Sequence, residues 1–214
     1  MKYQLIPVTP FQQNCSLIWC EQTLKAAVVD PGGDVERILA EAASNNVQIE
    51  QILLTHGHID HVGGAAALAK QLNIEIVGPH IADSFWLESL PKQSQHFGFA
   101  HSDPLSPTRY LQDGDEVKVG NQSLSVLHCP GHTPGHVVFY SKNDAIAWVG
   151  DVLFKGSVGR TDFPQSNHQD LIDSITTKLW PLGKQVQFVP GHGPLSTFGE
   201  ERVHNPFVAD QLFS

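Results

Sequence analysis

The sequence has little sulfur and no long apolar run. Its three cysteines are Cys15, Cys20 and Cys129. This odd count without paired spacing excludes a disulfide framework, and free thiols are typical of a reducing compartment. No run approaches the roughly 18 apolar residues that a membrane helix needs, and the N-terminal residues contain no signal-peptide pattern. We therefore expect a soluble cytoplasmic protein.

Positive charge is also scarce. The chain has 13 Lys and Arg residues against 22 Asp and Glu residues, which gives a formal net charge of -9. Because an acidic surface repels phosphate backbones and anionic lipids, we expect no nucleic-acid partner and no membrane partner. Histidine, in contrast, is abundant, with 12 residues. Since imidazole is the commonest metal-binding side chain, the composition favours metal binding.

The apolar segments predict one domain over residues 1–214, because this length supports one sizeable core but is short for two. In each half of the chain, strands precede helices. This order favours the α/β (α+β) fold class, with two sheets packed face to face and helices outside. The expected architecture is a four-layer αββα sandwich. The expected strands are Leu5–Val8, Ser16–Trp19, Lys25–Val29, Ile52–Leu54, Glu75–Val77, Glu116–Val119, Gln122–Leu127, Val137–Tyr140, Ala145–Val149 and Val186–Val189. Helices are expected from an Asp34 N-cap, over Val62–Leu72 and from an Asn167 N-cap.

The segment Thr55-His56-Gly57-His58-Ile59-Asp60-His61 directly follows a buried strand. In an extended segment, the rings of His56 and His58 point the same way. Asp60 and His61 follow at the start of the expected helix. Four ligand-type side chains in six positions cannot all face one ion, so this cluster predicts two adjacent metal ions.

Three more candidate ligands stand just after apolar strands. They are His132 in Pro-Gly-His-Thr, Asp151 after Trp-Val-Gly, and His192 in Pro-Gly-His-Gly. Rigid strand ends are where α/β-type enzymes build their sites. One strand-end histidine is more often a satisfied loop residue than a ligand. Together with the first cluster, however, these residues favour a metal site, because so many buried polar groups would otherwise be costly.

These motifs, in this order, resemble those of the metallo-β-lactamase superfamily, and within it the chain is similar to single-domain glyoxalase II-like hydrolases. The resemblance implies the metallo-β-lactamase fold and the hydrolysis of a thioester such as an S-2-hydroxyacylglutathione. It also implies two ion sites joined by an aspartate: His56, His58 and His132 for one ion, Asp60, His61 and His192 for the second, and Asp151 as the bridge.

Charge agrees with this division. Two divalent ions carry more positive charge than Asp60 and Asp151 can neutralise, and a bridging hydroxide fits the remainder. Asp60 is expected to position that hydroxide and so to be catalytic. Imidazole and carboxylate donors without thiolate suit zinc, iron or manganese. Zinc is the expected metal, with iron and manganese as alternatives.

The chain departs from the two-domain glyoxalase II pattern. Only 22 residues follow His192, so we expect no C-terminal helical domain for glutathione. Arg160 matches a basic glutathione contact of that family and is the expected substrate-binding residue, with a structural salt bridge as the alternative. The stretch Gly159–Phe163 also resembles the corresponding stretch of persulfide dioxygenases, which use one iron.

Three functions therefore remain open. The first is thioester hydrolysis, which suits a site without an extra general acid because a thiolate needs little protonation to leave. The second is a mononuclear-iron persulfide dioxygenase, and the third is a metal-binding module without catalysis. We expect a monomer with a small-molecule thioester as its partner.

Other residues give weaker indications. Asp30 ends a strand and is expected either to orient a metal ligand or to form a turn. Cys129 is expected to be a buried structural thiol. The segment Pro91–Thr108, which includes His96, is expected to be a long surface loop near the site.

Overall fold

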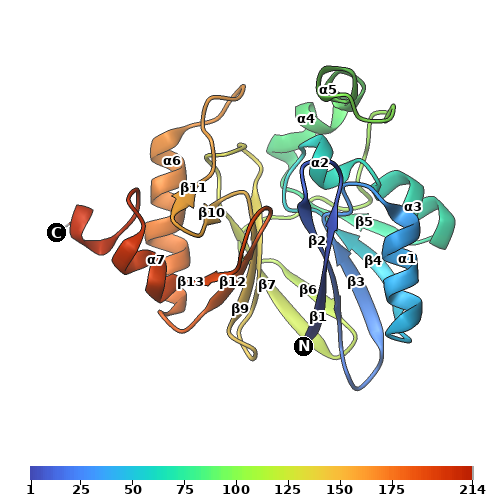
Figure 1. Cartoon of the computed structure of the whole chain (residues 1–214), viewed down its shortest axis with the longest axis horizontal. Coiled ribbons are helices and arrows are strands. Elements are labelled where there is room, and N and C mark those ends of the chain that lie inside the picture. The colour runs from blue at the N-terminus through green and yellow to red at the C-terminus, as the bar shows by residue number, and fades with distance from the viewer. Residues whose placement is uncertain (214) are drawn as a thin grey trace.

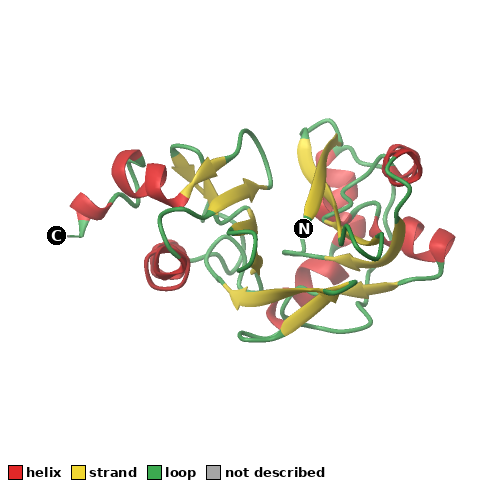
Figure 2. Ribbon diagram, turned by 90° about the horizontal axis from the view of Figure 1, so that it is seen from below, coloured by secondary structure: helices red, strands yellow, loops and turns green. Residues whose placement is uncertain are grey.

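The computed structural model describes residues 1–213 and has four layers. A five-stranded sheet of order β1-β2-β3-β4-β5 packs against a six-stranded sheet of order β13-β12-β9-β8-β7-β6. Helices lie on the outer face of each sheet (Figure 1), and a second view, turned by 90°, shows the same arrangement (Figure 2). The predicted αββα sandwich is confirmed.

The sheets are built from short strands. These are β1 (Lys2–Val8), β2 (Gln13–Trp19), β3 (Lys25–Val29), β4 (Gln48–Leu53), β5 (Glu75–Val77), β6 (Glu116–Val119), β7 (Gln122–His128), β8 (Val137–Ser141), β9 (Ile146–Gly150), β12 (Gln187–Pro190) and β13 (Ser196–Thr197). A separate hairpin consists of β10 (Leu153–Phe154) and β11 (Ser157–Val158). Every predicted strand is present, with ends shifted by a few residues.

Helices follow or connect these strands. They are α1 (Val35–Ser44), α2 (Ile59–Val62), α3 (Ala65–Leu72), α4 (Ser84–Glu88), α5 (Leu90–Phe97), α6 (His168–Asp173) and α7 (Phe198–His204), with a π-helical turn over Ser174–Leu179 and 3₁₀ turns over Ile81–Asp83, Trp180–Leu182 and Asp210–Leu212. Within residues 1–213, no helix combines the length and the apolar character that a membrane span requires.

Three apolar cores hold the layers together. Neighbouring residues of a strand point to opposite faces, so Val28 packs under the α1 and α3 helices while Val29 faces the other sheet. Phe139 and Trp148 fill the space between the two sheets. Leu171 packs beneath the outer face of the second sheet. Because helices cover the outer face of each sheet, the central strands β3, β8 and β9 are buried along most of their length.

The ends of several strands meet at one edge of this sandwich. Asp30 follows β3 and Thr55 follows β4, while Asp151 and His192 follow β9 and β12. The two sheets are joined there by a backbone hydrogen bond of 2.8 Å from the Val137 N–H to the Thr55 carbonyl. This edge therefore gathers residues that are far apart in the sequence.

Three local predictions were wrong. The helix expected over Val62–Leu72 breaks at Gly63-Gly64, where the Gly64 N–H donates to the Pro31 carbonyl at 2.8 Å. Asp34 stands at the predicted N-cap position of α1, but its side chain makes no cap hydrogen bond, because its carboxylate accepts the Thr9 N–H at 2.8 Å instead. The expected loop over Pro91–Thr108 begins as the helix α5.

Candidate metal centre

Three imidazole nitrogens converge between the sheets. His58 Nδ1 lies 3.1 Å from His56 Nε2 and 3.0 Å from His132 Nε2. Each outer ring has its other nitrogen occupied: His56 Nδ1 contacts the Thr55 hydroxyl at 3.0 Å, and His132 Nδ1 donates to the Arg160 carbonyl at 2.8 Å. The nitrogens that face one another are therefore free to act as donors to a cation.

A second donor set lies beside the first. Asp60, His61 and His192 present ligand atoms within 4.8 Å of one another, and His192 Nε2 lies 3.1 Å from Asp60 Oδ2. The short helix α2 carries Asp60 and His61, and the turn after β12 carries His192. Sequence neighbours thus divide between two sets, as the spacing of the motif predicted.

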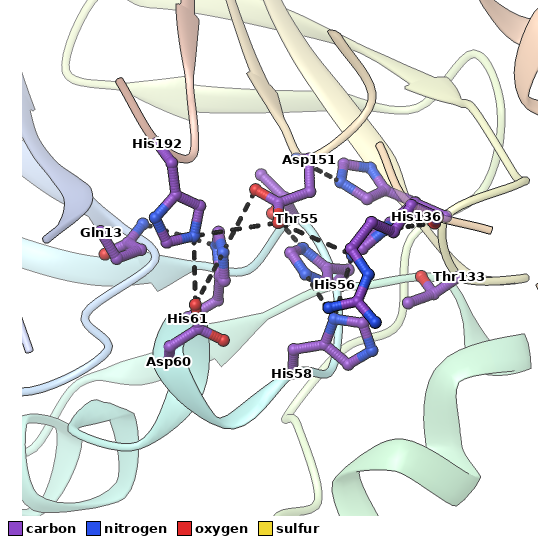
Figure 3. Close-up of polar contacts among 12 residues, drawn as sticks. Gln13, Thr55, His56, His58, Asp60, His61, Thr133, His136, Asp151 and His192 are labelled. Atoms are coloured by element: carbon purple, nitrogen blue, oxygen red, sulfur yellow. Dashed lines mark hydrogen bonds and ion pairs between the residues drawn. The ribbon is translucent and has the colours of Figure 1, made fainter. Parts of the chain in front are cut away.

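Asp151 lies between the two sets (Figure 3). Its Oδ1 is 3.4 Å from His61 Nε2, and its Oδ2 is 3.6 Å from His132 Nε2 and 3.9 Å from His192 Nε2. One carboxylate thus faces both groups of imidazoles. All seven residues predicted as ligands are brought together.

Polar atoms without partners show that this cluster suits metal ions. His61 Nε2 and Asp151 Oδ1 are buried without a hydrogen-bond partner among the described residues, a costly arrangement unless something else binds them. A side chain at Gly191 would fill the same space, since a Cβ there would lie 2.0 Å from Asp151 Oδ1. Imidazole and carboxylate donors suit zinc, iron and manganese.

Electrostatics divide the histidines into two groups. Burial, with the nearby His61, lowers the pKa of His56 well below its ordinary value, and burial also lowers the pKa of His58 and of His132. Burial would lower the pKa of His61 too, but the Asp151 and Asp60 carboxylates outweigh it and raise that pKa well above its ordinary value. The three-histidine set is therefore neutral and ready to bind a cation.

Asp30 orients the ring of His61. Its Oδ2 lies 2.9 Å from His61 Nδ1, and its carboxylate also accepts the N–H and the hydroxyl of Thr55 at 2.7 and 2.6 Å. A carboxylate behind a ligating imidazole fixes the tautomer and increases ligand basicity. Of the two roles considered for Asp30, the structure favours ligand orientation.

Two other buried residues support the centre, and neither was assigned a role from the sequence. The Asp151 N–H donates to His136 Nε2 at 3.1 Å, and the His136 ring stacks on His56 with centroids 4.7 Å apart.

The second residue is Asp83. It accepts the Gly57 N–H at 2.9 Å, the Thr133 hydroxyl at 2.8 Å and the Gly135 N–H at 2.6 Å. Asp83 therefore ties the loop of His56 and His58 to the loop of His132.

Five of the seven donors line a cleft of about 1410 Å³: His58, Asp60, His132, Asp151 and His192. Residues of α4 and α5, including Trp86, form one wall, and residues of the β10–β11 hairpin and the loop after it, including Phe163, form the other. These two groups of elements belong to opposite halves of the molecule (Figure 1). Because aromatic rings line both walls, the cleft offers an apolar surface beside the charged centre.

Arg160 lines this cleft, but its side chain is exposed and paired. Its guanidinium donates to both carboxylate oxygens of Asp162 at 3.0 and 2.9 Å and lies 4.7 Å from the centre of the Phe163 ring. The position suits the predicted substrate contact, and the ion pair suits the structural alternative. Cys129 is buried in the apolar core that also contains Leu171, and burial raises the pKa of its thiol to about 12.

Comparison with known proteins identifies the family. The family model of the metallo-beta-lactamase superfamily matches residues 8–192. The chain belongs to this superfamily. A hydroxyacylglutathione hydrolase, GloC of Haemophilus influenzae, is 45% identical to it over 209 residues, which cover 97% of this chain and 98% of the relative.

Solved structures of superfamily members have the same fold. BLEG-1, a B3 metallo-beta-lactamase, superposes with a TM-score of 0.89 at 34% identity and covers 97% of this chain and 99% of its own. TTHA1623, solved in a di-iron-bound form, superposes with a TM-score of 0.87 at 36% identity over 96% of this chain and 100% of its own. ETHE1 from Myxococcus xanthus superposes with a TM-score of 0.81 at 27% identity, covering 98% and 85%.

Proposed function

We propose that this chain is a binuclear metal-dependent thioesterase whose substrates are S-2-hydroxyacylglutathiones. The observation that carries the proposal is the position of Asp151, which lines an open cleft and lies between the two donor sets. The name of the GloC relative supports the substrate class. We propose zinc as the metal, with iron or manganese as alternatives, and a monomeric protein with a small-molecule thioester as its partner.

In this proposal, His56, His58 and His132 would hold one ion and Asp60, His61 and His192 would hold the second. Asp151, which faces both sets, would serve both ions. Bound divalent ions supply Lewis acidity and lower the pKa of water, which makes hydrolysis possible at neutral pH. Asp60, anchored 3.1 Å from His192 Nε2, is in place to orient the attacking group. Trp86 and Phe163 line the cleft, and their apolar rings lower the local polarity beside the centre and so strengthen its electrostatics.

The leaving group favours a thioester over an amide. Apart from the proposed metal donors, the titratable groups that line the cleft within residues 1–213 are Lys92, His96, Lys155 and Arg160, and all four are exposed. Within residues 1–213, the side chains of Lys92, His96 and Lys155 form no hydrogen bond that would position them as general acids. Arg160 is paired with Asp162, but a guanidinium does not give up its proton near neutral pH. A thiolate leaves without protonation because its conjugate acid has a pKa of about 8.5, whereas an amide nitrogen must be protonated before it leaves. We therefore expect poor β-lactam cleavage, despite the likeness to BLEG-1.

A persulfide dioxygenase is the second candidate. The stretch Gly159–Phe163, which resembles the corresponding stretch of persulfide dioxygenases, favours it. The same donor residues serve either chemistry, so the reaction itself must discriminate. The test is to incubate the metal-loaded protein with S-lactoylglutathione and, separately, with glutathione persulfide. We expect release of free thiol from the first and no oxygen consumption with the second; the opposite result would favour the dioxygenase.

A further inference from the structure

Charge in the cleft is opposite to charge in the whole chain. Apart from Asp60 and Asp151, which belong to the metal centre, every charged side chain that lines the cleft is a cation: Lys92, Lys155 or Arg160. Yet acidic residues outnumber basic ones by 22 to 13 over the sequence. A cleft with one sign of charge and apolar walls attracts ligands of the opposite sign.

Two of these cations have no counter-ion. Arg160 is paired with Asp162, and elsewhere Lys25 pairs with Glu50 at 2.8 Å. Neither Lys92 nor Lys155 forms an ion pair or a side-chain hydrogen bond within residues 1–213. Their ammonium groups are therefore the cleft's available positive charges.

The two lysines lie on opposite walls. Lys92 is in α5, and Lys155 is in the turn between β10 and β11. These elements belong to the two halves of the molecule that flank the cleft (Figure 1). The cleft that contains the metal donors is therefore lined by one unpaired lysine from each half, which suits a flexible molecule with two separate carboxylates.

We infer that Lys92 and Lys155 form a carboxylate-binding pair that selects thioesters whose thiol portion is anionic. The inference rests on the proposed function and assigns the substrate's carboxylates to these residues rather than to Arg160. Exposed ammonium groups remain hydrated, so each contributes modestly and is weakened by salt. The pair should therefore act on KM more than on kcat.

Two thioesters with the same lactoyl group test this inference, one of glutathione and one of the uncharged thiol N-acetylcysteamine. The selectivity is the ratio of their kcat/KM values at low ionic strength. For the double variant K92Q/K155Q we expect this ratio to fall about fivefold, mainly through KM. The control K142Q/K184Q removes the same charge from exposed lysines that do not line the cleft, and we expect it to keep the wild-type ratio. An unchanged ratio in K92Q/K155Q, or an equal fall in the control, overturns the inference.

A binding measurement separates this inference from the proposed function. S-methylglutathione is a thioether that cannot be hydrolysed, and its diethyl ester lacks both free carboxylates. By calorimetry, we expect K92Q/K155Q to bind the free acid about fivefold more weakly than the wild type, with no such loss for the diester. If neither thioester is hydrolysed but this difference is found, the proposed function fails and the carboxylate pair stands. Equal binding of the free acid by both proteins contradicts the pair.

Discussion

Nδ1 of His61 lies 2.9 Å from Oδ2 of Asp30, and both side chains are buried. Two further hydrogen bonds, both from Thr55, hold the same carboxylate. The Asp30 carboxylate therefore cannot rotate without losing three hydrogen bonds. It directs His61 Nε2 toward Asp60 and Asp151, at 3.7 and 3.4 Å.

Replacing Asp30 should weaken the set that contains His61. In Asp30→Asn, an amide N–H replaces one acceptor oxygen and faces other donors, so the imidazole loses its orientation. We expect affinity for one of the two ions to fall about 10- to 100-fold, measured by competition with a chelator. Asp34→Asn is the control, because Asp34 also follows β3 but contacts the Thr9 N–H instead. Equal affinities in both variants would refute this role for Asp30.

Asp83 should matter for the three-histidine set. Asp83→Ala leaves the buried N–H groups of Gly57 and Gly135 unpaired, at a cost of about 1–3 kcal/mol each. We expect lower thermal stability together with weaker binding of a metal ion by the three-histidine set, because the His56–His58 loop and the His132 loop lose their connection. Asp103→Ala, which changes a highly exposed carboxylate, should alter neither property. Reduced thermal stability with unchanged metal binding would limit Asp83 to a purely structural role.

Metal binding should depend on pH. In the metal-free protein, Asp151 and Asp60 hold the pKa of His61 well above its ordinary value despite the opposing effect of burial. Both nitrogens of this ring therefore carry a proton at neutral pH. A cation must displace that proton, and affinity for the Asp60, His61 and His192 set should fall as pH falls, by about tenfold per unit for each proton displaced. Titration of metal-free protein with zinc in a weak buffer at pH 7 should release acid. Binding without proton release would show that His61 is already neutral.

Variants of Arg160 and of Asp162 distinguish a substrate-binding role of the arginine from a structural salt bridge. If Arg160 contacts substrate, Arg160→Ala should raise KM about 5- to 30-fold at constant metal content, which corresponds to about 1–2 kcal/mol of lost binding free energy. Asp162→Ala should then leave KM unchanged or lower it, because the guanidinium is freed from its partner. If the pair is only structural, both variants should lower stability equally and leave KM alone. Steady-state kinetics and thermal melts on the two proteins decide between these outcomes.

Much of the centre was predictable because its signals are local. The cluster from His56 to His61 places four donors within six residues, and His132, Asp151 and His192 each follow an apolar strand and a small residue. Each pattern depends on the conformation of a few neighbouring residues. The alternation of strands and helices predicted the layers in the same way, and the comparison with superfamily members agrees.

Residues with distant partners carried no such signal. Asp83 is 26 residues from Gly57 and 52 from Gly135, and nothing near it in the sequence marks it as buried. The helix α5 was mistaken for a loop because two of its inward residues are polar. Gln93 accepts the Ile59 N–H at 2.9 Å, and Ser94 donates to the Leu90 carbonyl at 2.8 Å. Their partners satisfy them inside the protein and hide the expected apolar period.

The central claim is that two ions act together on a thioester. Its most direct test is to add zinc stepwise to metal-free protein and follow both bound metal and S-lactoylglutathione hydrolysis. We predict two equivalents bound per chain and full activity only after the second, with His58→Ala binding less metal and losing activity. Full activity with one equivalent, or a His58→Ala variant with wild-type metal content and rate, would contradict the account.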